Sequence, residues 1–362
     1  MEKNEATKKK VDKNYVAKSR IKRRILKNVW LVRSLLIAGI LIFFMAMYSL
    51  LGQILGGLTA SDYFSYAKNF VFTPEASARK FKDRTNILIL GKGGESHDAP
   101  DLTDTIIFSS ISHEKQDLIL LSLPRDIWVS EIRAKLNSAY YWGNQKEDGG
   151  GLILAKAVAE EVVGEPIHYA VVVDFSGFKK LIDTLGGVEV EIETAFVDEK
   201  FPILGKEDDE CGGDPEFKCR YETISFESGK QKMDGEKALK FARSRNSQGD
   251  EGTDLARAKR QQKVISAIKD KTLSWEVYSS PRKIGEILAI LKSNIETDML
   301  DNAGAVLSRR VFQTRDQIKS FVVPESFMES PGLLAQYDFL YVFIPSTGSW
   351  EDLYKWVEKI LY

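Results

Sequence analysis

Two aspartates, Asp104 and Asp126, flank a pair of short apolar segments, 105–111 and 118–123, that a polar link joins. Both segments have the length and composition of a strand, and a link this short predicts an antiparallel hairpin. The two aspartates are equally far from the middle of the link, so we expect them to be neighbours at the open end. Two adjacent carboxylates need a proton or a cation to relieve their repulsion, and Mg²⁺ (or Mn²⁺), which also takes phosphate oxygens as ligands, fits. The alternative is that each is an ordinary aspartate of a strand end or turn.

Basic side chains elsewhere in the sequence have spacings that suit a phosphate ligand. Arg243 and Arg245 are two residues apart, so both point the same way if the segment is extended. Arg257 and Gln261 are four apart, so they share a face if the segment is helical. Arginine is favoured for phosphate because its planar fork donates two parallel hydrogen bonds. The candidate set is Arg125, Lys135, Arg243, Arg245, Arg257 and Gln261. If the fold brings them together they describe a diphosphate pocket, and the alternative for any single one is a solvated charged surface.

The segments that must position these residues alternate between strand and helix patterns. Strands are expected at 86–90, 105–111, 118–123, 169–173, 188–192, 318–323 and 340–344. Helices are expected at 151–163, 178–185, 233–242, 255–271, 284–293 and 350–361. No internal repeat and no long linker interrupts this series. The pattern therefore predicts a single α/β domain from 81 to 362, built as three α-β-α layers around a central mixed sheet.

The N-terminal region is first basic and then apolar. Residues 1–33 hold 12 Lys and Arg against 3 Asp and Glu, whereas the rest of the chain holds 39 against 49. The uncharged run that follows is long enough to cross a bilayer as a helix, and the positive-inside rule puts the basic end in the cytoplasm. We expect a cytoplasmic tail (1–33), one transmembrane helix (34–58), a stalk (59–80) and an extracytoplasmic domain. A cleaved signal peptide is the alternative. The acidic body argues against a nucleic-acid partner.

The chain has two cysteines, Cys211 and Cys219, in a stretch rich in glycine and aspartate. Outside the membrane, an even pair at such short range is typical of a disulfide that closes a surface loop. A metal site would need more ligands than these two side chains. We therefore expect a Cys211–Cys219 disulfide, conditional on the extracytoplasmic location of the domain.

The motifs around these residues resemble the LytR-CpsA-Psr family of bacterial cell-envelope proteins. The segments that carry the resemblance are Leu-Thr-Asp-Thr (102–105), Ser-Leu-Pro-Arg-Asp (122–126), Lys-Leu-Asn-Ser-Ala-Tyr (135–140), Asp-Thr-Leu-Gly-Gly-Val-Glu-Val (183–190), Asp-Gly-Glu-Lys-Ala-Leu-Lys-Phe-Ala-Arg-Ser-Arg (234–245) and Asp-Leu-Ala-Arg-Ala-Lys-Arg-Gln-Gln (254–262). The match spans about 86–271, and the last two segments are specific. A single N-terminal span before an outer domain is similar to the family's usual layout.

The resemblance implies a reaction and a role for each candidate. Family members transfer teichoic acid, capsule or related glycopolymers from an undecaprenyl (polyprenyl) pyrophosphate carrier to peptidoglycan through a phosphodiester, with Mg²⁺. By motif, Asp104 and Asp126 would hold the metal, and Asp104 could also act as general base. The residues that would bind the pyrophosphate are Arg125, Lys135, Arg243, Arg245, Arg257 and Gln261. An apolar tunnel for the polyprenyl tail would lie between the sheet and the helices.

Two departures and two other functions remain open at this point. Thr103 stands where members often carry arginine, and neither the cysteine loop nor the 272–362 extension in this form is a fixed family feature. The same pocket could serve an envelope assembly or regulatory protein that binds the lipid-linked polymer without catalysis. It could also serve a pyrophosphatase that releases the polymer to water. Acceptor-dependent turnover separates the transferase from both.

Overall fold

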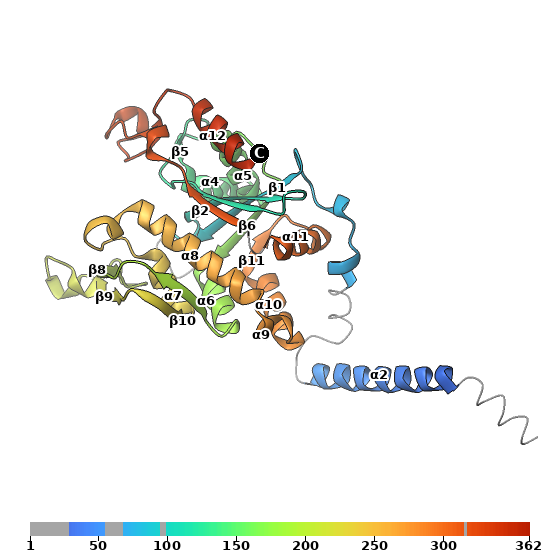
Figure 1. Cartoon of the computed structure of the whole chain (residues 1–362). Helices are drawn as coiled ribbons and strands as arrows, with labels where there is room; N and C mark the ends of the chain where they lie inside the picture. Colours follow the sequence, from blue (N-terminus) through green and yellow to red (C-terminus); the bar gives the residue numbers. More distant parts are fainter. Residues whose placement is uncertain (1–28, 55–67, 95–98, 315–316) are drawn as a thin grey trace, which may run out of the picture. The chain divides into compact units, whose positions relative to one another are not determined.

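The computed structural model describes residues 29–54, 68–94, 99–314 and 317–362 (Figure 1). The chain divides into two units, Met1–Ser65 and Tyr66–Tyr362. In the first unit, α2 (Val29–Ile54) is a helix of 26 residues whose side chains are described over 33–47, all of them exposed. Within the described residues, no helix meets the length and hydropathy required to cross a membrane. The predicted transmembrane helix at 34–58 therefore stays a prediction.

Parts of the three N-terminal predictions lie outside the described residues. These are most of the basic tail, up to residue 28, and the stretch 55–67, which holds the end of the predicted span and the beginning of the predicted stalk. The described end of the predicted stalk contains a short 3₁₀ helix, η1 (Glu75–Ser77), in the second unit. Glu75 forms ion pairs with Arg309 and Arg310, so this part of the chain is fixed to the second unit.

A mixed six-stranded sheet lies at the centre of the second unit, in the order β11-β6-β1-β2-β3-β12. Its strands are β1 (Arg84–Lys92), β2 (Thr103–Ser112), β3 (Leu118–Ser122), β6 (Tyr169–Asp174), β11 (Ile295–Thr297) and β12 (Ile318–Val322). The β1–β2, β2–β3 and β6–β11 pairs are antiparallel, and the β1–β6 and β3–β12 pairs are parallel. The predicted α/β class with a central mixed sheet is confirmed. Both edge strands come from residues after 271.

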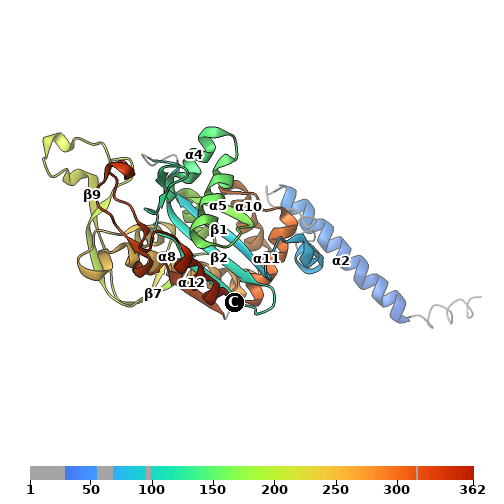
Figure 2. The ribbon, with the colours of Figure 1, turned by 90° about the horizontal axis from the view of Figure 1, so that it is seen from above.

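Helices cover both faces of the sheet, because alternate side chains of its strands point to opposite faces and both sets are apolar. Leu88 and Leu121 belong to a buried cluster that includes α4 (Ala139–Lys146), α5 (Gly150–Val163) and α12 (Glu351–Leu361). Ile87 and Leu120 belong to a second cluster on the other face, which α11 (Asp301–Gln313) completes. Figure 1 shows α5 and α12 above the sheet strands β1 and β2 and α11 below them, and in Figure 2, seen from above, α5 and α12 overlie these strands.

A third apolar cluster lies beside the sheet and carries the segments that hold the candidate arginines. Its elements are α6 (Phe175–Thr184), β7 (Val188–Ile192), β8 (Phe196–Pro202), β9 (Tyr221–Phe226), β10 (Gly229–Met233), α7 (Gly235–Arg243), α8 (Asp254–Thr272), α9 (Trp275–Tyr278) and α10 (Pro281–Asn294). Figure 1 shows the β8–β9 hairpin projecting at the far left of the molecule. Helix α8 contacts two of the three clusters. Val264 packs in this third cluster, and Ile265 packs against the second cluster, on the α11 face of the sheet.

Shorter elements complete the fold. They are β4 (Trp128–Val129), β5 (Ala134–Lys135), β13 (Met328–Glu329), β14 (Ile344–Pro345) and the 3₁₀ helices η2 (Leu136–Ser138), η3 (Cys211–Gly213), η4 (Lys218–Arg220), η5 (Gly249–Gly252), η6 (Glu325–Phe327) and η7 (Ala335–Tyr337). Cys211 and Cys219 form a disulfide, with their Cα atoms 5.5 Å apart, in the exposed loop between β8 and β9. The strand expected at 340–344 is wrong, since only Ile344 of that range is in a strand.

Candidate active site

The hairpin of β2 and β3 brings Asp104 close to the loop that follows β3. The observed register pairs Ile107 with Ser122, which extrapolates to Asp104 opposite Arg125 rather than opposite Asp126. The Arg125 guanidinium accordingly lies between the two carboxylates, 2.5 Å from Asp104 Oδ1 and 3.4 Å from Asp126 Oδ2. The two aspartates therefore contact the same arginine. The hairpin brings them to the same end, as predicted, but the residue directly opposite Asp104 is Arg125 and not Asp126.

Lys135 approaches the same centre from a small hairpin. Strands β4 and β5 pair Trp128 with Lys135, and the Lys135 Nζ atom lies 2.7 Å from Asp126 Oδ1. Asp126 is buried and is held in place by its own carbonyl, which accepts a hydrogen bond from the Phe343 amide. The Asp126 carboxylate thus contacts both a lysine and an arginine and fixes the position of each.

Positive charge accumulates around Asp104. Asp104, and after it Asp126, outweigh the effect of burial and raise the pKa of Arg125. Burial lowers the pKa of Arg243, and Asp104 acts against that effect. Burial also lowers the pKa of Arg257, and the like charges of Arg125 and Arg245 lower it further, while Asp104 acts in the opposite direction. Four predicted arginines thus lie close enough to interact through one carboxylate or one another.

Arginines remain protonated at any pH of interest, so this cluster has an excess of positive charge that a dianionic or trianionic ligand would relieve. Arg257 projects from the first turn of α8, which begins at Asp254 with Thr253 as its N-cap. Its guanidinium pairs with Asp254 at 2.9 Å. The helix N-terminus adds a partial positive charge on the same side.

Arg243 is the last residue of α7 and Arg245 lies in the loop that follows, which a buried carboxylate fixes. Asp198 of β8 is fully buried and accepts hydrogen bonds from the Ser244 hydroxyl (2.8 Å) and the Arg245 amide (3.1 Å). It accepts two more from the amides of Asn246 and Lys200. Asp198 is a positioning residue that no motif in the sequence indicates.

Arg260 of α8 also holds this loop in place. It is buried on α8 and donates to the carbonyls of Phe241 and Ser244, and it pairs with Glu251 at 2.8 Å. Arg260 stands in the quoted 254–262 motif, but its hydrogen bonds are with the protein. The Arg243 guanidinium lies over the rings of Phe175 (4.5 Å) and Phe201 (5.5 Å), which orient it without neutralising it.

A cavity of about 80 Å³ opens beside the carboxylates. Its polar lining comes from Asp104, Arg125, Asp126, Asp254, Arg257, Gln261, Ser122 and Glu325, and its apolar lining from Ile106, Leu123, Pro124, Leu255, Ala258, Val322, Val323, Met328 and Phe343. Lys135, Arg243 and Arg245 do not line it. Arg243 instead lines a larger cavity of about 170 Å³ between β8 and α7.

Several residues of this cavity were not anticipated from the sequence. Asp254 is three residues before Arg257, a spacing that predicts an ion pair on a helix, and the motif containing both was recognised. Met328, Phe343 and Glu325 come from the C-terminal segment, and no motif in the sequence connects that segment with the aspartates.

The two aspartates meet the basic requirement of a magnesium site. Both side chains contact Arg125, and the Asp104 side chain is 37% exposed and lines the cavity. Mg²⁺ binds through one or two carboxylates and completes its shell with water and phosphate oxygens. A donor set of two carboxylates beside a phosphate-binding arginine cluster therefore fits Mg²⁺, and it fits Zn²⁺ less well because no histidine or free cysteine is present among these residues.

The sequence of the chain resembles that of known proteins. A model of the LytR_cpsA_psr family matches residues 59–355, which includes the C-terminal segment. A protein of Oceanobacillus iheyensis, named polyisoprenyl-teichoic acid–peptidoglycan teichoic acid transferase TagU, is 35% identical over 61% of this chain and 60% of its own length. The TagU transferase of Enterococcus faecalis is 28% identical over 67% of this chain and 73% of its own length.

Solved structures support the fold. The crystal structure of Bacillus subtilis TagV superposes with a TM-score of 0.55 at 24% identity and covers 78% of this chain and 98% of TagV. A structure of TagT bound to LI-WTA superposes with a TM-score of 0.53 at 21% identity, over 78% of this chain and 94% of TagT.

Proposed function

The chain belongs to the LytR-CpsA-Psr family, and we propose that it is a phosphotransferase that moves a glycopolymer from a polyprenyl pyrophosphate carrier to peptidoglycan through a phosphodiester. The observation that carries the proposal is the cluster of Arg125, Arg243 and Arg257 around Asp104, with Arg245 close to Arg257. Relatives named teichoic acid transferases support it. The stretch aligned with the Oceanobacillus iheyensis protein covers 60% of that protein, so the activity is inferred for this chain and not transferred to it.

The arginine cluster would bind the diphosphate and the apolar wall of the 80 Å³ cavity would receive the prenyl chain. Arg125, Arg257 and Gln261 are among the polar residues that line the cavity, and Gln261 lies one helical turn beyond Arg257 on α8. Ile106 and Val322 are among its apolar residues. A ligand that is anionic at one end and aliphatic at the other matches this distribution.

In the proposed reaction an acceptor hydroxyl attacks the phosphorus that carries the sugar. A new P–O bond forms to the acceptor, the bridging P–O bond of the pyrophosphate breaks, and polyprenyl phosphate leaves with that bond's electron pair. The arginines stabilise negative charge that shifts onto the leaving phosphate. Asp104 takes the proton of the attacking hydroxyl, because its side chain is partly exposed and lines the cavity, whereas Asp126 is buried between Lys135 and Arg125.

Asp104 and Asp126 would hold Mg²⁺ (or Mn²⁺), which supplies further neutralisation of the phosphate charge. Arg125, which contacts both carboxylates, would then also bind the phosphate. Arg243, Arg245 and Arg257 bind and orient the diphosphate whether or not Asp104 holds a metal ion.

We also propose that the chain is a single-pass protein of the cell membrane, with the N-terminus in the cytoplasm and the second unit outside. The apolar side chains along the described part of α2, from Leu35 to Met47, support this location, as does the basic segment before it. Membrane lipid would then surround α2, and peptidoglycan and the lipid-linked glycopolymer would be the partners of the second unit.

The test is transfer by the full chain in detergent micelles, with a polyprenyl-pyrophosphate-linked oligosaccharide, Mg²⁺ and peptidoglycan oligomers. Mass spectrometry should detect polyprenyl monophosphate and the sugar phosphate attached to the acceptor. Asp126→Asn should lower turnover about 100-fold or more, and Asp338→Asn, which changes an exposed aspartate paired with Arg133, should not.

Other outcomes identify other functions. Polyprenyl monophosphate released without attachment to any acceptor would mean a pyrophosphatase. Binding of the donor without either product would mean an assembly or regulatory protein. Either result contradicts the transferase.

A further inference from the structure

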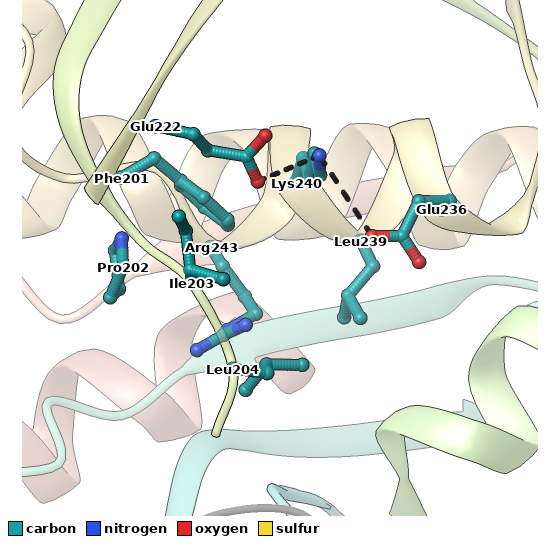
Figure 3. Close-up of a pocket in the computed structure, with 9 residues that line it drawn as sticks. All are labelled: Phe201, Pro202, Ile203, Leu204, Glu222, Glu236, Leu239, Lys240 and Arg243. Atoms are coloured by element: carbon teal, nitrogen blue, oxygen red, sulfur yellow. Dashed lines mark ion pairs between the residues drawn. The ribbon is translucent and has the colours of Figure 1, made fainter. Parts of the chain in front are cut away.

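A second cavity adjoins the arginine cluster at Arg243. It has a volume of about 170 Å³ and lies between the end of β8 and helix α7 (Figure 3). Arg243 lines this cavity, and Asp104 acts electrostatically on the same guanidinium. Arg243 therefore connects the proposed diphosphate site with the second cavity.

The second cavity has one charged wall and one apolar wall. On the charged wall, Lys240 pairs with Glu222 at 2.7 Å and with Glu236 at 4.0 Å, and Figure 3 shows these three side chains together along α7. On the other wall, Leu204 lies on the far side of the Arg243 guanidinium from these charges in the same view, and Ile203 lies beside Arg243. Phe201, Pro202 and Leu239 complete the lining.

This combination of charged and apolar lining suits neither the prenyl chain nor a further phosphate of the proposed donor. A prenyl chain would cover Glu222, Glu236 and Lys240 without giving them hydrogen bonds, and desolvating such groups is costly. A further phosphate would meet two carboxylates, and the lysine between them is already paired. A neutral ring with hydroxyl groups on its edge suits both walls, because carboxylates accept strong hydrogen bonds from hydroxyls and the ring faces can pack on apolar side chains.

The size of the cavity agrees with one ring. An engineered protein cavity of roughly 150 Å³ holds benzene, so a cavity of about 170 Å³ admits one six-membered ring. Its wall is also well defined, since the Ile203 amide donates to the Arg220 carbonyl at the base of the loop that the Cys211–Cys219 disulfide closes.

We propose that this cavity is a carbohydrate subsite, which takes a sugar ring next to the phosphate that Arg243 binds. The inference rests on the proposed function, because a phosphate on Arg243 is what puts a sugar within reach. The ring belongs either to the donor glycan or to the peptidoglycan acceptor, and the chemistry of recognition is the same for both.

Two variants test the subsite in the full chain. Leu204→Trp fills the cavity from its apolar wall, and Glu222→Gln removes a charged acceptor while keeping the shape of the charged wall. Glu189→Gln, an exposed glutamate of β7, is the matched control. Isothermal titration measures the Kd of a short-chain prenyl pyrophosphate with and without an attached disaccharide, and steady-state kinetics give the acceptor KM.

Weaker hydrogen bonds in Glu222→Gln and exclusion of the ring in Leu204→Trp should each raise the Kd of the sugar-bearing donor about tenfold. The sugar-free prenyl pyrophosphate should bind as it does to the wild type, which also shows that the variants are folded. If instead the acceptor KM rises while both donors bind normally, the subsite holds the acceptor sugar, and the carbohydrate assignment still stands.

Two results overturn the assignment in distinguishable ways. If the wild type binds both donors but neither variant changes the donor Kd or the acceptor KM, the cavity binds no sugar and the proposed function is unaffected. If the wild type binds neither prenyl pyrophosphate, the proposed function fails and the subsite fails with it.

Discussion

A single buried carboxylate organises the loop that carries Arg243 and Arg245. Asp198 is fully buried and accepts four hydrogen bonds, three of them from residues 244–246. Because these donors are two successive amides and a hydroxyl, the carboxylate fixes the backbone between the two arginines. Charge-assisted hydrogen bonds of this kind are stronger than neutral ones. Asp198 acts on the proposed substrate only through the position of the arginines.

Asp198→Asn should therefore weaken the binding of the donor by Arg243 and Arg245. The amide of asparagine presents hydrogens where the carboxylate accepted them, so the loop loses at least one acceptor and shifts. We expect kcat/KM for transfer to fall about tenfold to 100-fold, with most of the change in KM for the donor. Asp234→Asn, which keeps an N-cap on α7, is the control. Equal kinetics in Asp198→Asn and wild type would contradict the positioning role.

Two histidines make the stability of the second unit depend on pH. Burial lowers the pKa of His168 and of His113 below the ordinary value of 6.5. The folded protein then binds fewer protons than the unfolded chain just below pH 6.5, so these two residues contribute stability at neutral pH that is lost as the pH falls toward their folded pKa values. His168 Nδ1 accepts a hydrogen bond from the Asn86 amide, which needs the neutral ring.

His168→Asn should reduce this dependence, because the asparagine carbonyl can accept the same hydrogen bond without titrating. We expect the unfolding midpoint of the wild type to fall more steeply between pH 7 and about pH 5 than that of the variant, in thermal denaturation followed by circular dichroism. Parallel curves for the two proteins would show that His168 does not contribute to the pH dependence.

The elements nearest the site were the easiest to predict from the sequence. The β2–β3 hairpin follows from two apolar runs and a short link, and its observed register differs by one residue because Arg125 and not Asp126 falls opposite Asp104. Such a shift changes which residue lies between the charges, and a strand pattern cannot specify it.

Elements that depend on distant partners were not predicted. The edge strand β11 is three residues long and acquires its conformation from pairing with β6, more than a hundred residues earlier. Residues 340–343 look like a strand, but Leu340 and Tyr341 are exposed and Phe343 forms only an isolated bridge with Ile127. Burial, and after it the charge of Asp126, raises the pKa of Tyr341. Asp198 lies two residues after Phe196 on β8, so both side chains point to the buried face. Only its hydrogen bonds with the loop at residues 244–246 explain why a charged residue occupies that face.

The last helix, α12, is part of the main core. Leu353, Val357 and Leu361 are buried in the cluster that includes the sheet residues Leu88 and Leu121. The buried guanidinium of Arg84 on β1 donates to the Leu361 carbonyl, which ties the end of the chain to the first strand of the sheet. The helix therefore closes one layer of the fold.

Leu353→Ala should lower the free energy of unfolding of the second unit by about 2–5 kcal/mol, since it removes buried methyl groups and leaves a cavity. Lys355→Ala, on the exposed side of the same helix, should change it by less than about 0.5 kcal/mol. Denaturant titration of both variants gives the difference. A similarly small effect of Leu353→Ala would mean that α12 can detach without unfolding the core.

At the scale of the whole molecule, the two units differ in what holds them together. The three apolar clusters all lie between Ala78 and Leu361, within the second unit, Tyr66–Tyr362. That unit contains the complete sheet, all the candidate site residues and the second cavity. Its stability and its chemistry should therefore be independent of the first unit, whose proposed role is to keep the enzyme at the membrane.

A fragment of residues 66–362 separates these roles. Its thermal unfolding midpoint should agree with that of the full chain within about 2 °C, and with a water-soluble short-prenyl donor both should have the same kcat/KM. With an undecaprenyl-linked donor in lipid vesicles, the full chain should react faster, by up to about 10²–10⁴-fold, because anchoring raises the effective concentration of donor and enzyme in one surface. Equal rates on vesicles would mean that the first unit does not anchor the enzyme, whereas a lower midpoint for the fragment would mean that the first unit contributes to the fold.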